Sequence, residues 1–537
     1  MVRRPALPGT LHAAFRLGRP ADIRHKAALS AVVAMAVPDA ALLAAGRLDL
    51  ALYTSAGALC ALYGHDRPYA DRARALALVV LGMTAGVGTA LGAAALTRSP
   101  AVLVLVAAAL AAVQKTVCDA ARTGPPGNVV LTFVSASACF VPQRAADLPL
   151  HLGLTLACGL WAWLVCMAPA LVRPHGPDRI AAARALEAAA RAVRADAAAA
   201  PRARHAAWQA LLRAPAQVRA HVHGALARTE PDARGGHGRP AAPDPAQDTA
   251  HDAAPDAAPD ARRWEAWARD LRKGRPLPGD APAAPGPGAL PPPPPRLRPH
   301  LPGGARVLTG SALAGWASLA CGVGHPYWAV VTAASVIQAN SALSWHRALQ
   351  RTLGNLLGVL LFAVLVPVVR TGPLVMVLTA LALQAGAEAL ISRNYWLGTV
   401  CVTPMALLLT EFGGSHPARE LVGDRWTDTL VGAAAGLLAC ALVGNRRAAD
   451  RVEAAVARVD GARAAALAVP AGADRDRETA RDRLAAALVE LREAADTAAG
   501  EWRRTLPGER VARAERDGHR ALASLVRGRA PGGAAAF

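Results

Sequence analysis

The sequence predicts an all-α polytopic membrane protein, with two repeats of about six transmembrane helices and a cytoplasmic helical bundle. Of its 537 residues, 53% are hydrophobic and only 18% are charged, whereas soluble domains average about 25% charged residues. The apolar residues gather in runs of about twenty, which as a helix would cross a hydrocarbon layer of ~30 Å. Other stretches alternate Ala, Val and Leu with Arg, Asp and Glu at helical spacing. These features argue against a soluble enzyme, a secreted disulfide scaffold and a wholly disordered chain.

Each half of the membrane part is predicted to hold six apolar spans. The first six lie at 27–46, 48–64, 75–96, 100–118, 127–142 and 148–172. The second six lie at 307–323, 326–343, 352–369, 372–391, 394–411 and 426–444. The spans at 48–64 and 127–142 are short for a bilayer, and the first two spans could form a tight helical hairpin.

The remaining segments are predicted to lie in the cytoplasm. The full order is a basic N-terminus at 1–26, a first membrane half at 27–172, helices at 173–230, a disordered linker rich in Pro, Ala and Asp at 231–303, a second membrane half at 304–445, and C-terminal helices at 446–537. The linker ends in Pro291 to Pro295, and such a composition cannot bury a core. The C-terminal helices are expected to pack with the helices at 178–230.

The formal net charge of +20 comes almost entirely from arginine. A nucleic-acid-binding protein would concentrate this charge on a compact soluble domain, but here the arginines fall between apolar runs and in two alanine-rich stretches. With the N-terminus inside, the loops on the inner side carry far more arginine than the outer loops. This asymmetry predicts that both termini of the multi-pass protein lie in the cytoplasm. The expected partner is the lipid bilayer, with no nucleic acid.

No motif points to enzymatic chemistry. The eight cysteines lie in or beside apolar runs, without Cys-x-x-Cys pairs or zinc spacing, so no metal site is expected. A phosphate-binding Gly-x-x-x-x-Gly-Lys-[Ser/Thr] loop does not occur. We therefore expect no cofactor and no enzyme activity.

The two membrane halves are predicted to be a parallel repeat. The stretches from Tyr53 to Arg173 and from Tyr327 to Arg446 have nearly equal lengths. Each contains an Arg-Ala-Leu step, at 74–76 and 347–349, that opens a glycine-bearing helix, and each begins its fourth helix with proline. Both halves would start on the inner side, as in some transporter folds.

The most specific motifs lie in the second half. In order they are His325-Pro326-Tyr327-Trp328, Thr332, Arg347 and Arg351 followed by Gly354 and Gly358, Asn394-Tyr395-Trp396, Thr403, and Arg425, Asp428 and Gly432. This set resembles the fusaric acid resistance (FUSC) and aromatic acid exporter family, whose relatives include plant malate channels, over about 305–445. In the first half, Leu52-Tyr53 replaces the His-Pro-Tyr-Trp element. The resemblance implies an inner-membrane efflux or anion-permeation protein, commonly a homo-oligomer, with a helical cytoplasmic part.

Arg347 and Arg351 are candidates for an anion path. Four residues apart, they share one helical face, where guanidinium groups could attract carboxylates; alternatively, they anchor the helix by reaching toward headgroups. Lys115, Asn394 and Thr403 are further candidates for the substrate path. Gly354 and Gly358 have the spacing of a close helix contact. The aromatic residues near the span ends are expected to form interfacial belts, and His325 to mark a helix start.

Ionisable residues inside the spans are the candidates for proton coupling, because their cost in a membrane usually marks a function. They are Asp39 and Glu388, with Lys115 at the position of the first half that matches Glu388. Lys115 and Glu388 each lie fifteen residues after the proline that opens the fourth span of their half. We predict that Lys115 and Glu388 pair or face one water-filled path; the alternative is two side chains that reach separately to the surface.

Together these features predict a transporter that exports small aromatic or other organic carboxylates by secondary, proton-linked efflux. A passive organic-anion channel and a membrane scaffold without transport activity are the alternatives.

Overall fold

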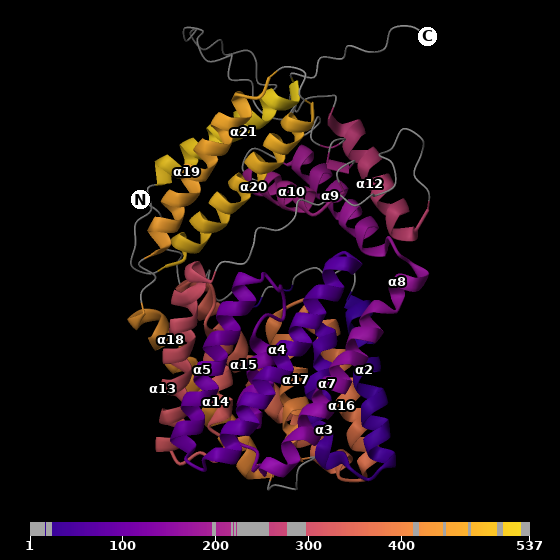
Figure 1. The fold of residues 1–537 in the computed structure, drawn as a ribbon, viewed down its shortest axis with the longest axis vertical. Coiled ribbons are helices and arrows are strands. Elements are labelled where there is room, and N and C mark those ends of the chain that lie inside the picture. Colours follow the sequence, from indigo (N-terminus) through magenta and orange to yellow (C-terminus); the bar gives the residue numbers. More distant parts are fainter. Residues whose placement is uncertain are drawn as a thin grey trace, which may run out of the picture. The chain divides into compact units, whose positions relative to one another are not determined.

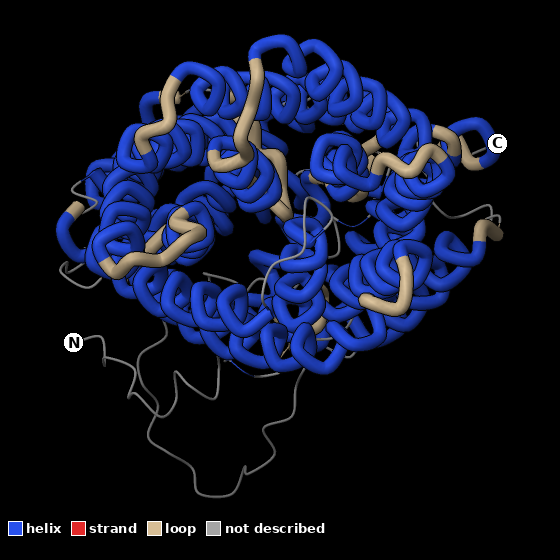
Figure 2. Tube along the Cα trace, turned by 90° about the horizontal axis from the view of Figure 1, so that it is seen from below, coloured by secondary structure: helices blue, strands red, loops and turns tan. Residues whose placement is uncertain are grey.

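The computed structural model describes most of the 537-residue chain. The described residues are 15, 17, 24–195, 200–215, 218–219, 222, 257–275, 297–411, 418–443, 447–470, 474–501 and 508–527. Within them the regular structure is entirely helical, without a strand (Figure 2). The chain forms two compact units (Figure 1). The membrane unit comprises residues 1–174, 294–445 and 500–502, and the helical unit comprises residues 175–293, 446–499 and 503–537. The all-α fold class and a separate helical bundle are confirmed.

The membrane unit has one helical segment at each predicted span. In the first half these are α2 (Arg24–Ala44), α3 (Ala51–Ala58) between the 3-10 turns η1 (Leu48–Leu50) and η2 (Leu59–Leu62), α4 (Tyr69–Leu96), α5 (Pro100–Ala120), α6 (Val129–Cys139) and α7 (Leu148–Met167), followed by the short α8 (Pro169–Val172). In the second half they are α13 (Leu301–Ala320), α14 (Tyr327–Val336), α15 (Ser341–Val369), α16 (Pro373–Ile391), α17 (Tyr395–Glu411) and α18 (Ala418–Leu442).

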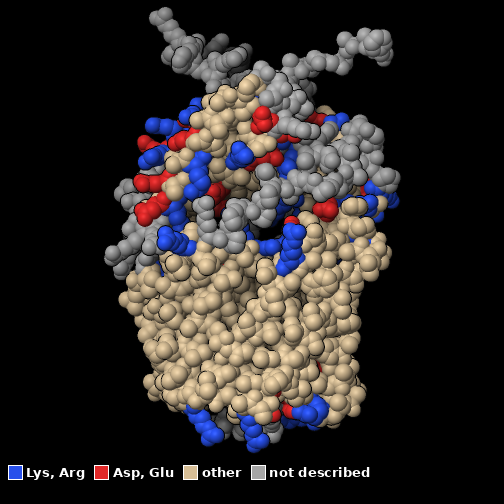
Figure 3. All heavy atoms as spheres, in the orientation of Figure 1, with Lys and Arg blue, Asp and Glu red and all other residues tan. Residues whose placement is uncertain are grey.

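Six of the described helices are long and apolar enough to cross a membrane. They are the helical stretches that contain α2, α4, α5, α7, α15 and α16. Four shorter apolar helices, at Leu48–Leu62, Val129–Cys139, Tyr327–Val336 and Tyr395–Leu409, lie among them. Figure 3 shows one face of the unit: on this face Lys, Arg, Asp and Glu gather toward the two ends, and the surface between them is uncharged. Such a band is what a lipid-facing surface requires.

The packing of the helices repeats from one half to the other. In the first half α3 packs on α7 and α4 packs on α6 and α7. In the second half α14 packs on α18, and α15 packs on α17 and α18. The contacts between the halves are also reciprocal, because α5 packs on α13 while α16 packs on α2. The structure therefore supports the predicted repeat, and it places the fourth helix of each half against the first helix of the other.

Glycines permit the closest helix crossings. A Cβ atom at Gly57 of α3 would collide with the backbone of α7, and one at Gly432 of α18 would collide with Ala329 of α14. Gly354 and Gly358 lie in the same way against α17, next to Thr399 and Thr403. The small-residue spacing in α15 thus has the packing role that its pattern predicts.

The helical unit has a core of its own, made mainly of Ala, Leu, Val and Trp side chains. Its helices are α9 (Gly176–Arg194), α10 (Ala200–Leu212), α12 (Ala257–Lys273), α19 (Arg447–Leu467), α20 (Asp474–Ala499) and α21 (Gly508–Arg527). The segments on either side of the second membrane half thus join in one bundle.

One part of the linker prediction is wrong. Within the range 231–303, which was expected to be disordered, α12 packs on α9 and buries Trp264, Trp267 and Leu271. Apolar residues three or four positions apart give α12 a continuous apolar face, which the high Ala, Pro and Asp content of the whole stretch hid. Residues 231–256 and 276–296, including the proline run, lie outside the described residues.

Candidate functional site

Besides Arg306 of α13, three charged side chains are buried inside the second membrane half. Arg351 of α15 is 5% exposed, and Arg425 and Asp428 of α18 are 2% and 0% exposed. Arg425 and Asp428 are three residues apart, so they share the face of α18 that Gly432 continues toward α14. Buried charges are normally paired or hydrogen-bonded, so the partners of these groups define the site.

Arg425 lies against an aromatic wall. Its guanidinium carbon is 5.0 Å from the centre of the Trp328 ring, and Trp328 is completely buried at the start of α14. The Nε and Nη1 atoms of Arg425 are buried with no hydrogen-bond partner, as is the indole Nε1 of Trp328. Leaving such donors unpaired costs roughly 1–3 kcal/mol for each group, and more for a charged one. These donors are available to an anionic ligand.

Arg351 lies beside a second aromatic residue. Its Nη1 donates a hydrogen bond to the Tyr395 hydroxyl at 2.9 Å, and the guanidinium of Arg347 lies over the same ring at 3.8 Å from its centre. The Nε of Arg351 is buried without a partner. Arg351 and Arg425 are close enough for their positive charges to interact. The local field therefore favours a negatively charged guest.

Among its described contacts, Asp428 forms no hydrogen bond with Arg425. Its Oδ1 accepts a hydrogen bond from Ser318 of α13 at 2.5 Å, while its Oδ2 is buried without a partner. The Thr332 hydroxyl on α14 is also buried and unpartnered. Donors and acceptors thus occur together in this interior.

A layer of neutral hydrogen bonds connects the helices of the site. The Thr403 hydroxyl donates to Asn355 Oδ1 at 2.7 Å, and Asn355 Nδ2 donates to the Thr429 hydroxyl at 2.9 Å. Asn355 follows Arg351 by one turn of α15, and Thr429 follows Arg425 by one turn of α18. Thr403, a predicted path residue, therefore belongs to the same cluster.

The His-Pro-Tyr-Trp element at 325–328 forms the part of this cluster at the start of α14. Pro326 precedes the first residue of α14, and Tyr327 packs beside Trp328 at 5.5 Å between ring centres. His325 Nδ1 lies 2.8 Å from Asp424 Oδ2, and its ring stacks on Trp328 at 4.7 Å. His325 thus marks the start of a helix, as its position in the sequence suggests, and also joins α14 to α18.

The structure does not form the predicted direct pair between Lys115 and Glu388. Lys115 pairs with Asp119 one turn along α5, at 2.8 Å, and Glu388 accepts a hydrogen bond from Gln384 at 3.4 Å. The physical reason is the reciprocal packing of the halves, which sets α5 against α13 and α16 against α2. Matching positions in a repeat need not face each other.

The other predicted residues occupy separate places. Asn394 accepts a hydrogen bond from Gln350 at 2.9 Å beside the start of α17. Asp39 of α2 is 3% exposed and has an unpartnered Oδ1, but it lies in the first half, where α2 packs on α3 and α7. No group of three or more His, Cys, Asp or Glu residues in the described ranges is arranged to hold a metal ion.

Sequence reasoning assigned one aromatic residue to the wrong environment. Trp328 was expected in an interfacial belt, but it is buried against Arg425. Asn355 and Ser318 were not singled out at all. The available signal was the spacing of Arg425 and Asp428 on one face of a span, where two ionisable groups are rare.

Comparisons with known proteins match the part of the chain that holds these residues. Residues 313–439 match the family described as fusaric acid resistance protein-like. The uncharacterised membrane protein YvaC of Bacillus subtilis (strain 168) is 32% identical over 191 residues, which are 34% of this chain and 29% of YvaC. The uncharacterised protein slr1298 of Synechocystis sp. (strain ATCC 27184 / PCC 6803 / Kazusa) is 27% identical over 139 residues, which are 26% of this chain and 18% of slr1298.

The aligned regions thus span less than a third of either relative, and no solved structure matches the chain. The family match covers the helices that bring Arg351, Arg425 and Asp428 together. Residues 313–439 of this polytopic membrane protein are therefore similar to the fusaric acid resistance protein-like family, and the resemblance to that family indicated by the sequence motifs is confirmed for this segment.

Proposed function

We propose that this protein is a membrane transporter that exports small organic anions, with aromatic carboxylates as the preferred class, by secondary proton-linked efflux. The observation that carries the proposal is the pair of buried arginines, Arg351 and Arg425, with unpartnered N–H groups beside Trp328 and Tyr395. The family match and the apolar helices around the site support transport as the general activity.

The chemistry of the site fits a carboxylate better than a neutral or cationic guest. A guanidinium presents several N–H donors in a planar fork that matches carboxylate geometry. Inside a membrane unit, where the effective dielectric constant is low, this attraction is stronger than at a water-exposed surface. The rings of Trp328 and Tyr395 offer apolar contact to the body of an aromatic acid.

Proton coupling is proposed for the carboxylates within the spans. Asp39 and Glu388 lie in helices of the membrane unit, and neither forms an ion pair with a basic residue in the described structure. Intramembrane carboxylates of this kind serve as proton relays in many pumps and transporters. We therefore retain both as proton-coupling candidates.

The proposal includes a plasma-membrane location with both termini in the cytoplasm, and assembly as a homo-oligomer. The orientation follows from the distribution of arginine between loops, and the location and the assembly follow from the family resemblance. Labelling of single cysteines at residue 240 and near the C-terminus in intact cells tests the orientation. Reaction with an impermeant reagent at either position would contradict it.

Transport is tested in inverted membrane vesicles with radiolabelled benzoate. We expect uptake that requires the protein and disappears when an ionophore collapses the proton gradient. Arg425→Gln should abolish this uptake. A matched control is Arg370→Gln, because Arg370 is an exposed arginine just after α15.

The alternatives give different results. A passive channel would conduct benzoate in a planar bilayer regardless of the proton gradient. A scaffold would neither bind nor move benzoate, and Arg425→Gln would then be without effect on any transport measurement.

A further inference from the structure

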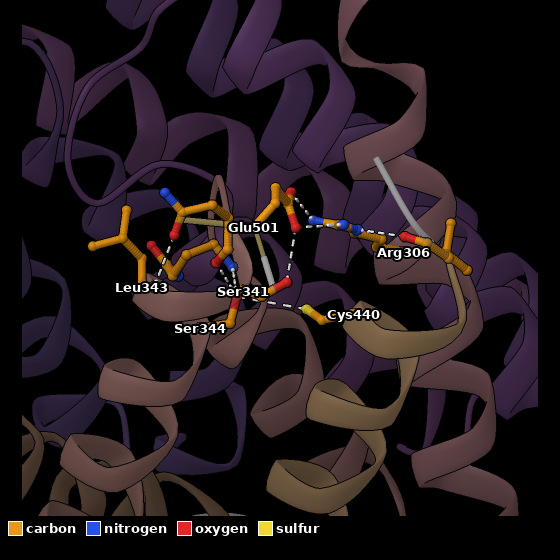
Figure 4. A network of polar contacts seen from close by, with 9 residues as sticks. Arg306, Ser341, Leu343, Ser344, Cys440 and Glu501 are labelled. Carbon is orange, nitrogen blue, oxygen red and sulfur yellow. Dashed lines mark hydrogen bonds and ion pairs between the residues drawn. The ribbon is translucent and has the colours of Figure 1, made fainter. Parts of the chain in front are cut away.

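The segment that follows α20 is part of the membrane unit, although α20 itself belongs to the helical unit. Figure 4 shows Glu501 of this segment between Arg306 of α13 and Ser341 of α15. The Glu501 carboxylate accepts hydrogen bonds from Arg306 Nη1 at 3.0 Å and Nη2 at 3.2 Å, and from the Ser341 hydroxyl at 2.8 Å. The side chains of Arg306 and Glu501 are only 3% and 8% exposed. Arg306 and Glu501 thus form a bidentate, buried ion pair.

The backbone of the same segment is also held. The Ala342 amide donates to the Gly500 carbonyl oxygen at 3.0 Å. Any Cβ atom at residue 500 would collide with the side chain of Asn340. Asn340 caps α15, because its Oδ1 accepts from the Leu343 amide at 2.9 Å. Glycine at 500 therefore lets the segment reach the first turn of α15 without displacing its cap.

Arg306 connects this segment to α18 as well. Its Nε donates to the carbonyl oxygen of Val443, just after the last turn of α18, at 2.7 Å. Nearby, Cys440 of α18 lies 3.5 Å from the Ser344 hydroxyl of α15 (Figure 4). Arg306 thus binds both the Glu501 carboxylate and the end of α18. The Glu501 carboxylate in turn binds the start of α15. The helices α15 and α18 are the two that carry Arg351 and Arg425.

In the first half, the loop before the third helix is held by that helix itself and not by a distant segment. We call the loop before the third helix of each half, together with the first turns of that helix, its corner. In the first half Arg72 of α4 donates to the carbonyl oxygens of Gly64, His65 and Arg67, in the loop directly before its own helix. In the second half Ser344 of α15 bonds to the segment before its helix, donating to the Asn340 carbonyl oxygen and accepting from the Gln338 amide, both at 2.9 Å, but no arginine of α15 does so among the described contacts. The charged contact there comes from Glu501, which is 195 residues away from Arg306.

We propose that Glu501 is a positioning residue for transport, which through its bonds to Arg306 and Ser341 fixes where α15 and α18 hold their arginines. The inference rests on the proposed function of the Arg351 and Arg425 site. Since α15 is one continuous helix from Ser341, a displacement of its first turn moves Arg351, which lies about 15 Å further along at 1.5 Å per residue.

Hydrogen exchange of the purified full-length protein tests the contact itself, without any transport substrate. We expect Glu501→Gln and Gly500→Ala each to speed exchange of the amides at 342–343 by at least tenfold. Glu501→Gln removes the charge of residue 501. Gly500→Ala keeps that charge but adds a Cβ atom that collides with Asn340. The amides at 69–75, at the start of α4, should not change and serve as the internal reference. Unchanged exchange at 342–343 in both variants would overturn the proposal.

Benzoate binding and uptake test the role in transport. Glu501→Gln should lower both the maximal uptake rate and the affinity for benzoate at least tenfold, because displacement of the first turn of α15 moves Arg351 away from the bound anion. The control is Glu490→Gln, which removes the exposed pair of Glu490 with Arg458 in the helical unit and should leave uptake within twofold of the wild type. Glu501→Asp should recover part of the rate.

The outcomes separate the two proposals. Normal uptake by Glu501→Gln, or an equal loss in Glu490→Gln, would overturn the positioning role and leave the proposed function intact. If the wild-type protein neither binds nor transports benzoate, or any other aromatic acid of a panel, the proposed function fails, whereas faster exchange at 342–343 would still establish the contact.

Discussion

The two membrane halves pack their helices alike but enclose different chemistry. In the first half, Gln114 of α5 donates to Ser135 and accepts from Thr132 of α6, at 2.8 and 3.1 Å, and Asn128 donates to Thr132 at 3.2 Å. That network is neutral. The second half instead encloses Arg351, Arg425 and Asp428, each with an unpartnered polar atom. The repeated packing therefore defines the scaffold, while the charged groups of one half supply the candidate site.

The largest expected effect comes from removing charge from the second half. Arg425→Gln should weaken benzoate binding by roughly a hundredfold, since loss of a buried charge that pairs with a ligand costs about 2–5 kcal/mol. Gln114→Leu in the first half should leave benzoate affinity within about threefold while it lowers thermal stability, because Ser135 loses its donor and the Thr132 hydroxyl loses its acceptor. Calorimetry on the purified proteins measures both. Equal loss of affinity in the two variants would remove the functional contrast between the halves.

The two corners before the third helices give the next effect. Arg72→Gln should destabilise the first half by about 2 kcal/mol, because three carbonyl oxygens lose a charged donor. Hydrogen exchange should rise at 64–72 and stay constant at 340–346, where Glu501 has the corresponding role. A change at 340–346 as large as that at 64–72 would show that the corners are not independent.

Glycine substitutions test whether the shared packing matters equally in both halves. Gly57→Ala and Gly432→Ala should each lower stability by about 1–3 kcal/mol, because the added Cβ meets the backbone of a neighbouring helix. Gly92→Ala should be neutral or stabilising by up to ~1 kcal/mol, because no atom lies within 4 Å of its Cβ position and alanine favours a helix. Thermal unfolding in detergent distinguishes these signs. Tolerance of alanine at Gly432 but not at Gly57 would mean that the halves differ in packing as well.

The smallest expected effect contrasts the membrane halves with the helical unit. Burial lowers the pKa of His519 on α21 to about 4, with further contributions from Arg204 and His205. In the unfolded chain this imidazole titrates near ~6.5, so below that pH the unfolded state binds a proton that the folded state does not. Stability should therefore fall as the pH drops from about 6.5 toward 4, by roughly 1–3 kcal/mol.

His519→Gln should remove this part of the pH dependence. Circular dichroism during urea unfolding between pH 4 and pH 7 measures it. An unchanged slope would assign the acid sensitivity to other groups.

The helices and the repeat were predictable from the sequence because their signals are local. Run length, periodicity and helix-opening prolines such as Pro100 and Pro373 depend on neighbouring residues only, and the observed helices begin at those two prolines. The motif around Arg347 to Gly358 likewise located the family-like segment. The sequence analysis missed the helix α12, because the composition of the whole linker outweighed the helical periodicity of one short part of it.

Which side chains meet was decided by tertiary structure alone. Sequence matched Lys115 with Glu388, but the reciprocal packing of the halves gave each a neighbour on its own helix. Nothing local marks Glu501 as the partner of Arg306, because each is an ordinary charged residue near the end of a helix. Such pairs form only when distant helices have packed, since the burial that makes them consequential is a property of the assembled unit.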